Sequence, residues 1–170
     1  MKIRGGFVSN SSSTSFTFIF KGDKIEDLFN LIKKYNQYFD LYFTDSGEKE
    51  LHCTAEDVIK SMEEIKPNLK IENINSLRLY IKTRMRDLEI TSEKNKDHHD
   101  WYSEYLSDCM DKELLMEEAA KREFTNALVI DFGDNSGVIS GGTVGYCMDY
   151  EGRSININKP DLIVTTEQNR

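Results

Sequence analysis

A chain of 170 residues in which 38% of the side chains are hydrophobic and 11% are aromatic is long enough to bury the core of one domain. Its net charge of −8 disfavours direct binding to nucleic acid or to an anionic membrane, and it leaves a basic protein as the expected class of partner. The mean hydropathy of −0.57, with no apolar run approaching about 18 residues, predicts no membrane-spanning helix.

The cysteines and the start of the chain indicate a reducing compartment. Cys53, Cys109 and Cys147 are odd in number and widely spaced. The opening MKIRGGFVSN is followed by serines and not by the apolar segment of a secretory signal. We therefore expect reduced thiols and a cytoplasmic location.

Residues 1–22 form a serine-rich lead and a first strand. In SFTFIF (15–20) the residues Phe16, Phe18 and Phe20 alternate with smaller side chains, which predicts a half-buried strand. A turn follows, and Asp23 with Glu26 has the spacing of a capping box at the start of a helix.

The next segment predicts a short hairpin and a helix. Residues 41–44 and 50–53 read as strands, with a turn at 46–48. Thr54 and Asp57 predict the start of a helix, and Pro67 predicts its end.

A helical segment is expected over residues 76–124. Ser76 is the expected cap of its first helix, and residues 91–97 lack apolar periodicity and predict a loop or break. A long amphipathic helix is expected from about His98 to Phe124. The apolar stripe of the first helix is Leu77, Ile81, Met85 and Leu88, and that of the second is Trp101, Tyr102, Tyr105, Leu106, Cys109, Met116, Ala119 and Ala120.

Residues 125–170 predict a β-rich end. The continuous apolar run 127–132 suits an internal strand, and 161–166 suits a last strand. Short strands are expected at 138–140, 144–150 and 154–157 between glycine-containing turns. The chain is thus predicted to be one α+β domain, residues 1–170, with a mixed or antiparallel sheet.

Catalytic and metal-binding motifs are missing from the sequence. His98 and His99 are adjacent, and no CxxC, HxxxH or HExxH spacing occurs, so neither a metal nor another cofactor is expected. The run 140–143, SGGT, lacks the lysine of a phosphate loop and fits a hairpin better. An enzyme remains an alternative only through a site assembled in space from Ser12, His52, His98, His99 or Cys147.

The charges are more informative. Acidic residues recur every three or four positions along the long helix, which places them in one row with a step of about 5–6 Å. We call these residues the acidic row: Asp97, Asp100, Glu104, Asp108, Asp111 and Glu118. The helix before it carries a basic face, Arg78, Lys82, Arg84 and Arg86.

Two interpretations of the acidic row stay open. It is either a solvated helix face, with or without pairing to the basic helix beside it, or a partner-binding surface whose spacing resembles that of the phosphates along one nucleic-acid strand. In the second case it would occupy the cationic channel of a basic nucleic-acid-binding protein.

The N-terminal stretch GFVSNSSSTSF (6–16) resembles a motif, close to GFVSNSSSSSF, found at the start of many uncharacterised bacteriophage and prophage proteins. Thr14 departs from that motif but keeps the hydroxyl group. The resemblance implies a phage-type protein that acts in the cytoplasm of a bacterial host or within a virion, and it transfers no catalytic residue.

The residues themselves predict a backbone-bonding turn at 9–15, with a ligand or docking loop at Asn10, Ser11, Ser12 and Ser13 as the functional alternative. Taken together, the sequence favours a non-enzymatic binding protein that engages a host macromolecule and inhibits a nucleic-acid-handling or defence system through the acidic row. A virion or assembly component, with oligomeric state open, is the alternative from another class.

Overall fold

The computed structural model describes residues 13–45, 49–94, 99–133 and 155–169 of the chain. The strands are β1 Ser13–Phe20, β2 Leu41–Asp45, β3 Lys49–Cys53, β4 Glu72–Asn73, β5 Asn126–Gly133, β6 Ile157–Asn158 and β7 Leu162–Asn169. The helices are α1 Ile25–Lys34, α2 Ala55–Glu64, α3 Ile74–Lys94 and α4 His99–Lys121, with 3₁₀ turns η1 Asn36–Tyr38 and η2 Lys66–Asn68.

A five-stranded antiparallel sheet organises the molecule, which confirms the predicted α+β class. Its strand order is β4-β5-β1-β7-β6, and β2 with β3 forms a separate two-stranded sheet. The first strand, β1, lies in the centre and pairs along its whole length with β5 and with β7, from Ser13 to Phe20. The long strands β5 and β7, which are both far from β1 in sequence, therefore flank it on its two sides.

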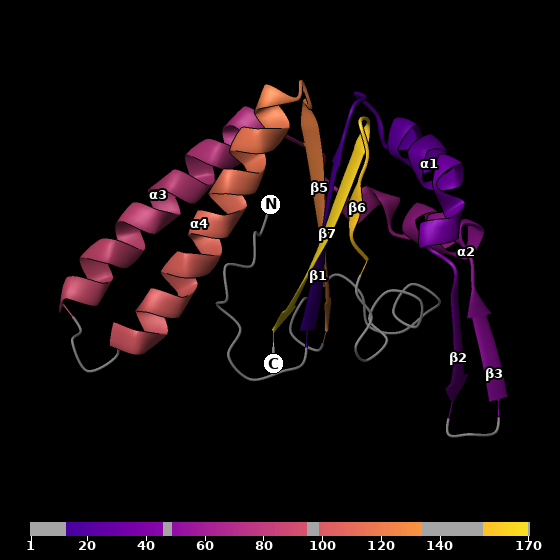
Figure 1. Ribbon diagram of the computed structural model, residues 1–170, viewed down its shortest axis with the longest axis horizontal. Coiled ribbons are helices and arrows are strands. Elements are labelled where there is room, and N and C mark those ends of the chain that lie inside the picture. Colours follow the sequence, from indigo (N-terminus) through magenta and orange to yellow (C-terminus); the bar gives the residue numbers. More distant parts are fainter. Residues whose placement is uncertain (1–12, 46–48, 95–98, 134–154, 170) are drawn as a thin grey trace.

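The predicted alternation of β1 is confirmed, and it divides the core into two. Phe16, Phe18 and Phe20 are fully buried in one core together with α1 and α2. Ile19 points to the opposite face and belongs to a second core with α3 and α4. Figure 1 shows the result, with α1 and α2 on one side of the sheet and the α3–α4 hairpin on the other.

The start of α1 corrects the predicted capping pair. The side chain of Asp27, and not that of Glu26, accepts backbone hydrogen bonds from Asp23 (2.9 Å) and Lys24 (3.1 Å). Gly22 in the turn before it has φ +153°, a conformation that L side chains rarely adopt. A capping box is thus present, as predicted, but its residues are Lys24 and Asp27, one position after the predicted pair.

Helix α2 begins as predicted and ends earlier. Thr54 Oγ1 accepts a hydrogen bond from the Asp57 amide (3.2 Å), and Asp57 Oδ2 accepts one from the Thr54 amide (2.9 Å). The helix ends at Glu64, while Pro67 lies in the following turn η2.

Helix α3 extends beyond both predicted limits. It begins at Ile74, so Ser76 lies inside its first turn; the side chain of Asn73 accepts the Asn75 amide instead (2.8 Å). It continues to Lys94 through residues expected to be a loop, and Thr91 bonds back to the Asp87 carbonyl (2.8 Å). The rest of the predicted loop lies outside the described residues.

Helix α4 confirms the long predicted helix with shorter bounds, His99–Lys121. It ends in an αL turn: Glu123 has φ 65°, and the Phe124 amide donates to the Ala119 carbonyl (3.0 Å). The predicted stripe is buried at Tyr105, Cys109, Met116 and Ala119 and half-buried at Tyr102, Leu106 and Ala120, and the side chain of Trp101 is not described.

The β-rich end is confirmed where it is described. Strand β5 contains the predicted run 127–132, β7 overlaps the predicted run 161–166 and continues to Asn169, and β6 overlaps the predicted strand 154–157 only at Ile157. The strands expected at 138–140 and 144–150 lie outside the described residues. Among the residues that are described, no helix is long and apolar enough to cross a membrane.

Candidate binding site at helix α4

The structure describes four side chains of the acidic row. Glu104, Asp111 and Glu118 are exposed on α4, and Asp108 is half-buried. Asp97 lies outside the described residues, and for Asp100 only the backbone, within α4, is described.

Two cations of the basic face of α3 pair with a carboxylate that is outside the acidic row. Arg78 Nη2 lies 3.5 Å from Glu113 Oε1, and Lys82 Nζ lies 3.8 Å from the same oxygen. Glu113 is not a member of the row, because it lies on the side of α4 that meets α3. The sequence left pairing between the two helices open, and Glu113 was not among the residues that its pattern singled out.

Over the described part of the chain, three members of the row have no ion pair. No salt bridge joins Glu104, Asp111 or Glu118 to another described residue. Asp108 makes an interaction of its own. No ion pair within the described residues neutralises Glu104, Asp111 or Glu118, and these exposed carboxylates fit both a solvated helix face and a partner-binding surface.

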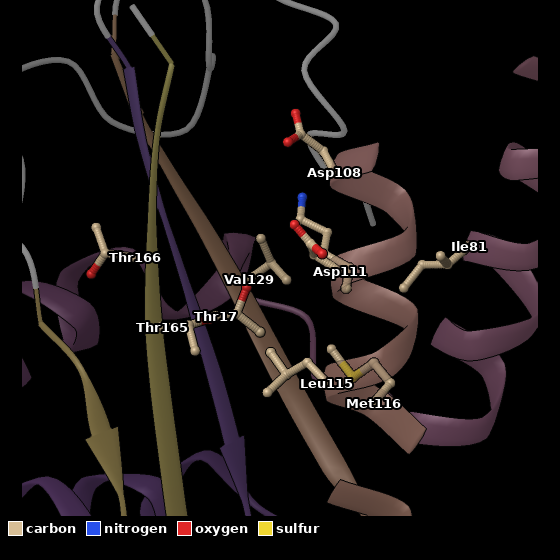
Figure 2. Close-up of a pocket in the computed structure, with 10 residues that line it drawn as sticks. Thr17, Ile81, Asp108, Asp111, Leu115, Met116, Val129, Thr165 and Thr166 are labelled. Carbon is tan, nitrogen blue, oxygen red and sulfur yellow. The ribbon is translucent and has the colours of Figure 1, made fainter. Parts of the chain in front are cut away.

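The middle of the row faces the sheet. Asp108 and Asp111 line a pocket of about 330 Å³ between α4 and the sheet. Figure 2 shows both side chains on the flank of α4 that is turned toward strands β1, β5 and β7. The middle of the acidic row, Asp108 and Asp111, therefore forms part of the pocket wall.

The α3–α4 hairpin is inclined to the sheet. The start of α3 and the end of α4 lie near the sheet, and the opposite ends of both helices lie further from it (Figure 1). Where α4 is close, Ile19 packs opposite Ala127 and Ile163 in the second core. One step along β1 on the same face, Thr17 lies between Val129 and Thr165, and all three line the pocket.

Arg122, directly after α4, contacts the β6–β7 turn. Its guanidinium donates to Asn158 Oδ1 (2.6 Å) and to the Lys159 carbonyl (2.8 Å), and it lies over the ring of Phe124 (5.2 Å). These contacts tie the segment that follows α4 to the β6–β7 turn.

The serine-rich stretch is not wholly a turn. Ser13 lies in β1 and pairs with Gly133 and Asn169, so the turn predicted at 9–15 does not extend to its end, while the ligand or docking loop stays a prediction. Asn10, Ser11 and Ser12 lie outside the described residues. Ser15, which ends the stretch, is buried in the sheet.

The residues named for an enzymatic site lie beyond the side chains that the structure describes. Ser12, His98 and Cys147 lie outside the described residues, and the side chains of His52 and His99 are not described. The described part of the chain contains no group of three or more His, Cys, Asp or Glu side chains that could hold a metal ion. Cys109 is a buried thiol in the second core.

A second cluster of charged and phenolic groups joins the end of α1 to the β6–β7 turn. Asp161 accepts hydrogen bonds from Lys34 (2.6 Å) and from the Tyr35 hydroxyl (2.5 Å), and Lys159 lies over the ring of Tyr38 (5.2 Å). The bond to Asp161 raises the pKa of Tyr35, and the contact with Lys159 lowers the pKa of Tyr38. The hydrogen bond between Tyr35 and Asp161 joins residues that are 126 positions apart in sequence. We therefore interpret the cluster as a structural link between α1 and the β6–β7 turn.

Comparisons with protein-family models, with curated proteins and with solved structures return no match for this chain.

Proposed function

We propose that the protein is a non-catalytic binding protein that engages a basic protein through the acidic side of α4. The observation that carries this proposal is the pairing of Arg78 and Lys82 with Glu113. It engages these two cations of α3 with a residue outside the acidic row, which leaves Glu104, Asp111 and Glu118 exposed and available to an external partner.

The electrostatics support a basic partner. Like charges spaced by three or four residues destabilise a helix by about a few tenths of a kcal/mol per pair, so the acidic row slightly lowers the stability of α4. A chain of net charge −8 adds a long-range attraction that accelerates association with a positively charged surface. Such binding weakens as salt is added.

The partner we propose is a nucleic-acid-handling protein of a bacterial host. The support is the step of about 5–6 Å between row positions, which is close to that of phosphates along one strand. The resemblance of residues 6–16 to a phage motif supports a role in the host cytoplasm, as an inhibitor of a host system. The turn of Asp108 and Asp111 toward the sheet adds a requirement: the partner has to approach along the open side of the pocket.

The test compares two variants with the same change in charge. The first neutralises the exposed row members, Glu104→Gln, Asp111→Asn and Glu118→Gln. The control neutralises three exposed carboxylates of α2 on the other side of the sheet, Glu56→Gln, Glu63→Gln and Glu64→Gln.

Each protein is immobilised and exposed to a bacterial lysate treated with nuclease, and bound proteins are quantified at low and high salt. We expect the wild type and the α2 variant to retain the same basic proteins, and the α4 variant to lose them. Equal retention by both variants would show that only net charge matters, and the proposal would be wrong. Circular dichroism checks that both variants are folded.

A further inference from the structure

We propose that the pocket between α4 and the sheet binds a small amphipathic organic cation. Its apolar body would lie on the aliphatic side chains of the pocket, and its ammonium group would lie between Asp111 and the hydroxyl of Thr17. This goes beyond the proposed function, because the ligand is a small molecule and not the basic protein.

The pocket has the size and the walls of a small-molecule site. Its volume is about 330 Å³, within the range that ligand pockets occupy. Ile81 of α3, Leu115 and Met116 of α4 and Val129 of β5 supply apolar surface. Figure 2 shows Leu115 and Met116 further along α4 than the two aspartates, so the apolar and acidic parts of the wall are separate. A ligand with one apolar end and one polar end matches that division.

Thr17 provides an observation that is independent of the carboxylates. Its side chain is only 8% exposed and lines the pocket. No hydrogen bond joins its hydroxyl to another residue in the described part of the chain, and Ser15 two positions before it does have a partner. The hydroxyl is not among the fully enclosed side-chain atoms that lack a partner, so it opens into the pocket and can bond a polar group that is placed there.

The charges of the lining select a cation. Asp108 and Asp111 carry two negative charges against the single positive charge of Lys112. Asp108 and Lys112 have interactions of their own, so the ammonium is assigned to Asp111, which is exposed. A pocket with an excess negative charge and a largely apolar wall disfavours phosphates and carboxylates, and it favours an ammonium on an apolar body.

The experiment uses the full chain and three matched probes: n-hexylamine, 1-hexanol and hexanoate. Binding is followed by amide NMR shifts at about physiological salt. We expect n-hexylamine to saturate and to shift the amides of Thr17, Leu115 and Thr165. The alcohol should bind about tenfold more weakly, because it lacks the charge-assisted hydrogen bond, and hexanoate should not bind.

Two variants make the test specific to the site. Asp111→Asn should weaken n-hexylamine binding about tenfold, and Thr17→Val should weaken it by a smaller factor. Glu118→Gln makes the same change in charge on the same helix, but Glu118 does not line the pocket. Its binding should match that of the wild type.

Three results would overturn the proposal: hexanoate binding as well as the amine, an equal effect of Asp111→Asn and Glu118→Gln, or shifts spread over the acidic surface without saturation. The proposed function is judged separately, because the capture experiment also depends on Glu104 and Glu118, which lie outside the pocket. Loss of amine binding in Asp111→Asn with normal capture by the Asp111→Asn single variant would support the small-molecule site alone.

Discussion

Replacing Phe18 by alanine should remove a large part of the stability of the protein. Phe18 lies at the centre of the central strand, where it pairs with Leu128 of β5 and Val164 of β7. All three side chains are fully buried in the core that includes α1 and α2. The ring therefore contacts both neighbouring strands and the helical layer, and its removal leaves a cavity that β1 cannot close without leaving its register.

The expected cost is about 3–5 kcal/mol, the usual range for Phe→Ala in a core. Since a domain is stable by only about 5–15 kcal/mol, the variant should unfold at a clearly lower urea concentration. Urea unfolding followed by circular dichroism measures the change, and the m-value should stay the same because the unfolded chain exposes almost the same surface.

Ile19→Val is the matched control on the opposite face of the same strand. Ile19 is fully buried in the core with α3 and α4, and loss of one methylene should cost about 0.5–1.5 kcal/mol. Amide shifts should change mainly in α1 and α2 for the Phe18 variant and mainly in α3 and α4 for the Ile19 variant. A cost below about 1 kcal/mol for Phe18→Ala, or shift changes on the opposite layers, would refute the assignment of the two faces.

Three further predictions concern turns and charges. Gly22→Ala should lower the melting temperature, because φ is +153° and the new Cβ would lie 2.5 Å from Asp27 Cβ; an unchanged melting temperature would contradict this strain. Glu113→Gln should destabilise the protein by about 0.5–1 kcal/mol by unpairing Arg78, whose side chain is 26% exposed, and the loss measured in urea should shrink at high salt; a salt-independent loss would refute an ionic cause. Burial raises the pKa of Asp161, but its hydrogen bonds outweigh this and leave the pKa below its usual value, so its stabilising effect should be present at neutral pH and be lost as the pH falls below about 4. Melting curves between pH 7 and pH 3 should fall more steeply for the wild type than for Asp161→Asn, and parallel curves would contradict the assignment.

The regular elements were predictable because their apolar residues repeat with one clear period. Alternation identified β1, and a 3.6-residue stripe identified α4 and its buried residues Cys109 and Met116. Helix ends were less predictable, since several polar residues near each end are competent caps. Asp27 acts in place of Glu26, and Asn73 in place of Ser76, because the backbone geometry of the turn decides which oxygen reaches the free amides.

The candidate site was predictable only in part. Helical spacing placed Asp108 and Asp111 on one flank of α4, but nothing local indicated that this flank faces the sheet. The pocket depends on the lean of the hairpin and on a strand pairing that brings Thr165 beside Thr17. The alternation in β1 already placed Thr17 opposite the phenylalanines; the missing information was which helix covers that face.

The same limit explains Glu113. Its position among many carboxylates of α4 is unremarkable in sequence, yet it is the one that reaches Arg78 and Lys82. Which carboxylate neutralises a basic helix depends on how two helices rotate against each other when they pack, and periodicity alone does not fix that rotation.

The most direct test of the central claim is zero-length carbodiimide cross-linking of the protein to the basic protein that it captures, with the joined residues identified by mass spectrometry. The reagent links a carboxylate to an amine only where the two are in contact. We expect bonds from Glu104, Asp111 or Glu118 to lysines of the partner. Cross-links confined to carboxylates of α2, such as Glu63 and Glu64, would contradict it.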